Sequence, residues 1–330
     1  MIMNQRTDKM NLMRDYFFSG SLTFIKPELI YNSSLRFPLM VNIEPTNACN
    51  MKCFMCPRLT MRRKVGFMDF DLYKRIIDES IEYGGILIAN MHKDGEACLH
   101  PKFPEMAEYA KKVGGVKITH FNTNGTVLDD TLILKLIEGG MDDITFSIDA
   151  VNPQTFKKIK GYDKLREVEA NVNRFVELRN EARSQSPFLR AKIIGCDLNR
   201  DEISPFFEKW TGVVDEVYVQ EINTFGGWME VEQKGNYFPC QSPWYALAVN
   251  WDGTVNLCSD DYGGHEPLGN LKDNSLREIW VGDKTNRYRE LLWQGRISEI
   301  PECAQCTRWE EGPDLTEWLR KRGNVRIERK

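Results

Sequence analysis

Residues 44–58 read EPTNACNMKCFMCPR and contain Cys49, Cys53 and Cys56 in a Cys-x3-Cys-x2-Cys pattern. The three cysteines follow a short β-rich run, Leu39–Ile43, so they are expected in the loop after a strand. Three thiolates can hold three irons of a 4Fe-4S cluster and leave the fourth iron open to a small-molecule chelate. A structural zinc site normally takes four protein ligands, and no fourth cysteine or histidine lies nearby in the sequence. The pattern therefore favours an iron–sulfur site with one open position over a zinc site.

Around this loop, short β-rich runs alternate with longer helical runs over residues 37–231. This alternation is typical of repeated βα units and a parallel sheet. It predicts an α/β fold, a partial (β/α)6 barrel of the TIM type. The six predicted strands are Leu39–Ile43, Ile86–Ala89, Lys117–Phe121, Asp143–Ile148, Leu189–Ile194 and Glu216–Gln220, and the predicted helices fall within residues 69–84, 103–114, 130–140, 165–182 and 203–210.

Polar side chains gather where the predicted strands end. Asn122 and Asn124 follow the third strand, Ser147 and Asp149 mark the end of the fourth, and Glu221 follows the sixth. The carboxyl ends of the strands hold the active site in parallel βα barrels, so these residues are expected beside a ligand. For Asn124 followed by glycine, and for Asp129, turn and helix-capping chemistry is the simpler interpretation.

A smaller α+β domain is expected after the barrel, over residues 232–310. A leader (1–36) precedes the barrel, and a basic tail (311–330) follows the smaller domain. It begins with a β-hairpin around Asp252 and Gly253. Helical runs follow at Leu276–Trp280 and Asn286–Trp293. The region also contains four cysteines, which suit either zinc or an iron–sulfur cluster. They are Cys240, Cys258, Cys303 and Cys306.

Composition limits the classes of function. The chain has 330 residues, of which 42% are hydrophobic, so it can bury a large core without disulfides. Its net charge of −4 gives no basic field for nucleic acid. No apolar stretch is long enough to span a membrane, and the first 20 residues lack the apolar core of a secretory signal. These features predict a cytoplasmic protein, in which clustered cysteines indicate metal binding or catalysis.

The stretch around the first three cysteines resembles the radical S-adenosylmethionine (SAM) superfamily, over about residues 38–310. The resemblance implies that SAM chelates the open iron and that the reduced cluster cleaves it to a 5′-deoxyadenosyl radical, which abstracts a hydrogen atom from the substrate. It also implies a reducing partner such as flavodoxin or ferredoxin.

The resemblance assigns further SAM contacts residue by residue. The family's glycine-rich Gly-Gly-Glu-Pro motif corresponds to Asp94-Gly95-Glu96-Ala97, with Asp94 in place of a glycine and Ala97 in place of the proline. Met55 takes the position that often packs on adenine. The remaining expected SAM contacts are Asn122, Asn124, Ser147, Asp149 and Arg190.

The C-terminal cysteines resemble the shortened SPASM domain called Twitch, which holds one auxiliary 4Fe-4S cluster. The chain is thus expected to bind two 4Fe-4S clusters. Their spacing is similar to that of 2-deoxy-scyllo-inosamine dehydrogenase and related sugar and aminocyclitol enzymes. A cluster with four protein ligands cannot chelate substrate, so its expected task is electron transfer, as the oxidation of an alcohol to a ketone requires.

Three alternatives stay open. One is a radical epimerase of a similar sugar-like substrate, which needs a hydrogen donor; Cys196 and Cys98 are the candidates. Glu221 is a further candidate catalytic residue. A buried free cysteine is more often a small apolar residue. The other two alternatives are a peptide- or protein-modifying SPASM enzyme and a non-catalytic metal protein.

Overall fold

The computed structural model describes residues 25–33, 35–222, 229–230, 236–264, 267–323 and 325–327. Its centre is one nine-stranded sheet in the order β6-β5-β4-β3-β2-β1-β7-β8-β9. The first six strands are parallel, which confirms the predicted α/β fold. They are β1 (Met40–Ile43), β2 (Ile86–Asn90), β3 (Val116–Thr123), β4 (Asp143–Ser147), β5 (Phe188–Gly195) and β6 (Glu216–Glu221).

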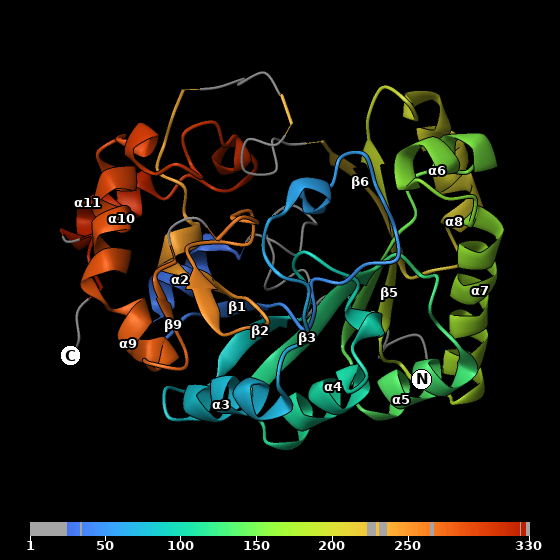
Figure 1. Ribbon diagram of the computed structural model, residues 1–330, viewed down its shortest axis with the longest axis horizontal. Coiled ribbons are helices and arrows are strands. Elements are labelled where there is room, and N and C mark those ends of the chain that lie inside the picture. The colour runs from blue at the N-terminus through green and yellow to red at the C-terminus, as the bar shows by residue number, and fades with distance from the viewer. Residues whose placement is uncertain are drawn as a thin grey trace.

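The helices between these strands cover the outside of the curved sheet, as Figure 1 shows. Some of them begin at side-chain caps: Asp69 accepts from the backbone of Asp71 and Leu72, and Asp129 accepts from Leu132 N, the capping role expected for it. β6 and β9 are the edges of the sheet, so the barrel is partial. The helices are α3 (Phe70–Ile81), α4 (Phe103–Lys112), α5 (Asp130–Glu138), α6 (Pro153–Lys160), α7 (Leu165–Glu181) and α8 (Ile203–Trp210).

The C-terminal hairpin continues the barrel sheet. β7 (Ala246–Val249) pairs in parallel with β1, and β8 (Thr254–Asn256) and β9 (Gly269–Asn270) follow as antiparallel strands. This pairing fixes the hairpin beside the first cysteine loop, because both segments leave neighbouring strands at the same edge. The expected domain boundary between residues 231 and 232 lies outside the described residues.

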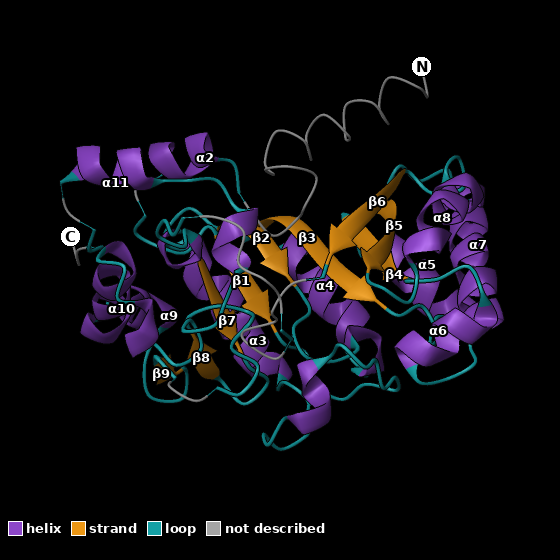
Figure 2. Ribbon diagram, turned by 90° about the horizontal axis from the view of Figure 1, so that it is seen from above, coloured by secondary structure: helices purple, strands orange, loops and turns teal. Residues whose placement is uncertain are grey.

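Parts of the expected leader and tail pack against each other. α2 (Pro27–Asn32) and α11 (Thr316–Arg322) lie side by side in Figure 2, and the rings of Tyr31 and Trp318 stack at 5.4 Å. Leu319 of α11 is buried, so this part of the basic tail contributes to the core. The remaining helices are α9 (Leu276–Trp280) and α10 (Asp283–Trp293). None of the helices in the described part of the chain is long and apolar enough to cross a membrane.

Candidate active site and second cysteine site

A cavity of about 280 Å³ lies at the carboxyl ends of the barrel strands. Residues from the loops after β1, β2, β3 and β4 meet there, as parallel strands of one sheet require. It brings together most of the site residues that the sequence predicts, namely Cys49, Cys53, Cys56, Met55, Asp94, Gly95, Glu96, Asn122, Asn124, Ser147 and Asp149.

The loop with the three cysteines is held at both sides. Lys52 N and Phe54 N donate to the backbone oxygens of Lys160 and Ile159 at the end of α6, each at 3.0 Å. On the other side, the amide of Asn124 lies 3.9 Å from Cys49 Sγ. Backbone hydrogen bonds to α6 and a side-chain contact from Asn124 thus hold the loop.

Burial raises the pKa of all three thiols, that of Cys56 to about 12. Because metal ligands must be thiolates, a bound cation is what would stabilise their charged form here. Three half-buried cysteines on one cavity, with no fourth cysteine lining it among the described residues, fit the three-ligand cluster that the sequence predicts.

Gly95 packs directly on the cysteine loop. A Cβ atom at this position would lie 2.2 Å from Thr46 O and 2.7 Å from Ala48 O, so no side chain fits. The next residue, Glu96, is buried and its carboxylate accepts from Thr123 Oγ1 at 2.9 Å and from Asn124 N at 2.7 Å. Burial raises the pKa of Glu96, although these hydrogen bonds act against the rise. The glycine motif therefore ties the loops after β1, β2 and β3 together.

Asp94, which stands where the family has a glycine, takes part in an ionic cluster. It pairs with Lys93 and, at 2.9 Å, with Arg63. Arg63 Nε also donates to Tyr262 O at 2.9 Å, and Lys93 Nζ donates to Asp261 O at 2.9 Å. Through these contacts the glycine motif binds the loop that follows β8.

Asp149, two residues after the end of β4, lies in the left-handed region with φ of 68°. Its carboxylate accepts from Ile194 N at 2.7 Å and forms an ion pair with Lys160 of α6. Burial alone would lower the pKa of Lys160, but the Asp149 carboxylate raises it. α6 was not among the predicted helices, because its sequence PQTFKKIK has few apolar residues, and Lys160 was missed with it.

The sequence reasoning also missed polar groups on the cavity lining. Asn122 contacts the His92 ring at 2.8 Å, and Lys192 donates to Gln220 Oε1 at 3.3 Å. The side-chain oxygens of Asn90 and Asn122 are buried and have no hydrogen-bond partner within the described part of the chain. The available signal for Lys192 was its place in the β-rich run LRAKIIG, in which only Arg190 and Lys192 are charged.

Four residues predicted to contact SAM or to act in catalysis do not line this cavity. Arg190 is buried near the amino end of β5, where it pairs with Glu216 and, at 2.9 Å, with Asp143. Its register places it at the start of β6, away from the carboxyl ends.

The two lone cysteines and Glu221 are also outside the lining. Cys98 packs against the main core, and burial, together with Glu96, raises its pKa well above the usual range. Cys196 is buried in a small apolar cluster with Met55 and Ile194. Glu221 is exposed at the end of β6.

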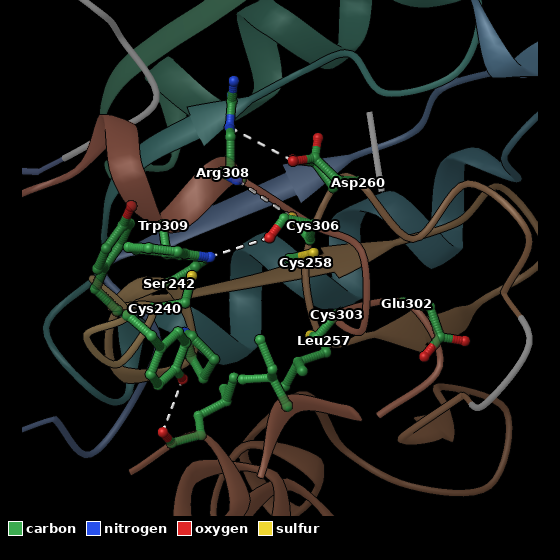
Figure 3. A pocket seen from close by; sticks show the side chains of 16 residues that line it. Cys240, Ser242, Leu257, Cys258, Asp260, Glu302, Cys303, Cys306, Arg308 and Trp309 are labelled. Carbon is green, nitrogen blue, oxygen red and sulfur yellow. Dashed lines mark hydrogen bonds and ion pairs between the residues drawn. The ribbon is translucent and has the colours of Figure 1, made fainter. Parts of the chain in front are cut away.

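The four C-terminal cysteines line a second cavity of about 50 Å³, shown in Figure 3. Burial raises the pKa of Cys240 to about 11 and that of Cys306 to about 12, and it also raises the pKa of Cys258 and that of Cys303 well above the usual range. Within the described residues, no group of three or more His, Cys, Asp or Glu side chains is arranged to hold a metal ion. The fit to a cluster therefore rests on the donor set, because four thiols line one small cavity. The other lining side chains are mostly aromatic or aliphatic and include Tyr237, Tyr245, Leu257, Leu292, Ile297 and Trp309.

The two cavities share a wall. Ser259, Asp260 and Arg308 line both of them. Arg308 Nε lies 3.4 Å from Asp260 Oδ2, the pair joined by a dashed line in Figure 3. Arg308 N also donates to Cys306 Sγ at 3.4 Å. The wall between the second cysteine site and the first cavity thus contains Ser259 and this ion pair.

Comparisons with known proteins match both sites. Residues 43–186 match the radical SAM superfamily, and residues 240–307 match SPASM, an iron–sulfur cluster-binding domain.

A relative in Pyrococcus furiosus, the tungsten-containing aldehyde ferredoxin oxidoreductase cofactor-modifying protein, is 27% identical over 313 residues, which cover 80% of this chain and 86% of the relative. The SAM-dependent 2-deoxy-scyllo-inosamine dehydrogenase of Niallia circulans is 22% identical over 272 residues, which cover 81% of this chain and 92% of that enzyme. The crystal structure of BtrN in complex with AdoMet and 2-DOIA has a TM-score of 0.57 at 18% identity and covers 82% of this chain and 93% of BtrN. At that identity the likeness to BtrN shows the shared fold.

Proposed function

Because the chain belongs to the radical SAM superfamily and contains a SPASM domain, we propose that it oxidises a secondary alcohol of a sugar, nucleotide sugar or aminocyclitol to a ketone. The observation that supports this reaction best is the wall shared by the two cavities. An alcohol radical must lose one electron to become a ketone, and an acceptor behind that wall would be close to the substrate.

The residues of the first cavity fit a 4Fe-4S cluster with SAM. Cys49, Cys53 and Cys56 would hold three irons, and the fourth would bind SAM. When bound, this pair supplies the 5′-deoxyadenosyl radical, and electrons would come from a partner such as flavodoxin or ferredoxin. The protein's own contribution is orientation. Gly95 lets its loop approach the cysteine loop, and Ser147, which lines the cavity, would contact the ribose.

The second cavity fits a cluster with four protein ligands. Cys240, Cys258, Cys303 and Cys306 would hold all its irons, and such a cluster supplies a one-electron acceptor. The mostly aromatic and aliphatic wall makes this site less polar than the first cavity. We therefore assign electron transfer to it, with two 4Fe-4S clusters in the whole chain.

Two relatives support a small-molecule substrate. One is a dehydrogenase of 2-deoxy-scyllo-inosamine, and the other is a cofactor-modifying protein. The unpartnered oxygens of Asn90 and Asn122 would accept hydrogen bonds from hydroxyl or amino groups of a polar molecule. An epimerase is supported less well, because no cysteine other than the expected cluster ligands lines the first cavity in the described part of the chain.

The test is anaerobic turnover of the reconstituted enzyme with SAM, a reductant and a panel that includes 2-deoxy-scyllo-inosamine. Dehydrogenation removes two mass units from the product. Uptake of one solvent deuterium without that loss indicates epimerisation and contradicts the proposal. We expect the loss of two mass units both with a chemical reductant and with reduced flavodoxin.

A further inference from the structure

Two buried lysines line the first cavity in different surroundings. Lys160 is 4% exposed and pairs with the Asp149 carboxylate. Lys192 is 5% exposed, and its ammonium group donates to the neutral Gln220 side chain. Among the residues that the structure describes, no carboxylate forms an ion pair with Lys192. A buried ammonium group without a counter-charge is unfavourable, so the protonation equilibrium of Lys192 shifts toward the neutral amine.

The charges that face Lys192 come from three neighbouring elements. Burial lowers its pKa to about 8, and Asp149 at the end of β4 acts against this change. Lys160 at the end of α6 and Arg308 beyond the second cysteine site lower it further. His92, which follows β2, is itself kept neutral, because burial, His120 and Lys192 lower its pKa well below the usual range.

Other acidic or basic groups on the cavity lining are engaged by the protein. Glu96 accepts from Thr123 and Asn124, and Asp149 accepts from Ile194 N and pairs with Lys160. Asp94 pairs with Lys93 and Arg63, and Asp260 pairs with Arg308. Both ring nitrogens of His92 contact Asn122. Lys192 is thus the base on the described lining whose amine has only a neutral partner.

We propose that Lys192 is a catalytic residue that accepts the hydroxyl proton of the substrate alcohol, an assignment that rests on the function proposed above. After the carbinol hydrogen has been abstracted, the carbon radical still carries its O–H group. The O–H bond breaks, its electron pair stays on oxygen, and the proton forms a new N–H bond on the neutral Lys192 amine. The unpaired electron then leaves for a one-electron oxidant of the iron–sulfur class, and the C=O bond forms.

The first test measures the ionisation of the Lys192 amine, on the reconstituted enzyme without substrate. Acetic anhydride at a series of pH values acetylates neutral amines, and mass spectrometry gives the extent at each lysine. We expect half-maximal acetylation of Lys192 near pH 8, whereas Lys160 stays unreactive through that range. Gln220→Glu places a carboxylate beside the amine and should raise the Lys192 midpoint by about one pH unit or more.

Two labelling results would overturn the assignment. One is a Lys192 midpoint near about 10.4, the ordinary lysine value. The other is no acetylation at any pH, because a base that so small a reagent cannot reach cannot meet a substrate either.

Turnover of 2-deoxy-scyllo-inosamine and the other alcohols of the panel tests the catalytic role. Product formation should rise with pH and level off above about 8, because the neutral amine is the active form. Lys192→Met and Lys192→Arg should lower it by roughly 100-fold or more while deoxyadenosine still forms. Gln220→Glu should move the profile to higher pH, and ethylamine should partly rescue Lys192→Ala.

The outcomes separate this assignment from the proposed function. Undiminished oxidation by Lys192→Met overturns the lysine assignment alone. A wild-type enzyme that oxidises none of the alcohols overturns the proposed function and this assignment together, even where labelling gives a midpoint near 8.

Discussion

The two cysteine sites differ in the number of their thiols and in the character of their walls. The first cavity, about 280 Å³, has three cysteines and a lining of amides, carboxylates and lysines. The second, about 50 Å³, has four cysteines and mostly aromatic or aliphatic neighbours. The missing thiol and the polar wall suit an exchangeable ligand, and the fourth thiol and the apolar wall suit a closed cluster. The difference agrees with the proposed division of tasks, in which the first site carries the chemistry and the second accepts an electron.

The largest expected effect comes from removing the three-cysteine site. The triple variant Cys49→Ala, Cys53→Ala and Cys56→Ala should abolish reductive SAM cleavage, because four protein ligands leave no iron open at the second site. Iron content should fall from about eight to about four per chain. Deoxyadenosine formation at the wild-type rate would contradict the assignment of the first cavity.

Removing ligands of the four-cysteine site should separate the two activities. Cys303→Ala with Cys306→Ala should halve the iron content and stop product formation, while SAM cleavage at the first site continues. Because cluster binding also contributes folding energy, circular dichroism must show a folded variant. Ketone formation by the folded variant would exclude the second site as the electron acceptor.

An added methyl group should test how closely the glycine loop approaches the first site. Gly95→Ala places a Cβ atom 2.2 Å from Thr46 O, so one of the two loops has to move. We expect SAM cleavage to fall by roughly tenfold or more, since a displacement near 1 Å is costly in active sites. Gly195→Ala is the control, because Gly195, like Gly95, has no positive φ and its added Cβ atom would meet its nearest neighbours only at 3.6 Å.

Much of the fold could be predicted because its strands are apolar, β-rich and bounded by polar turns. β1, β2 and β4 lie within one residue of their predicted bounds at each end. α6 was not predicted, because the sequence marks it by an Asn152 cap and a proline rather than by an apolar stripe. The site residues that belong to local sequence motifs, the cysteine loop and the glycine motif, could also be predicted.

The rest of the site depends on contacts between distant segments. Lys192 and Gln220 face the cavity because of the β5–β6 register, which also places Arg190 at the other end of the barrel. The wall shared by the cavities depends on the β1–β7 pairing, which brings the loop after β8 over the first site. No local pattern in the sequence carries that information.

The smallest expected effect concerns the ion pair in that wall. Asp260 and Arg308 each stand two residues after a cysteine of the second site and pair at 3.4 Å. A reduced cluster gains negative charge, so Asp260→Asn should raise its midpoint potential and Arg308→Gln should lower it. Each shift should be tens of millivolts, where roughly 59 mV corresponds to tenfold for one electron. The double variant should lie between the two single ones. Redox titration followed by electron paramagnetic resonance measures this directly, and equal shifts of both clusters would show that the pair does not act on the second site in particular.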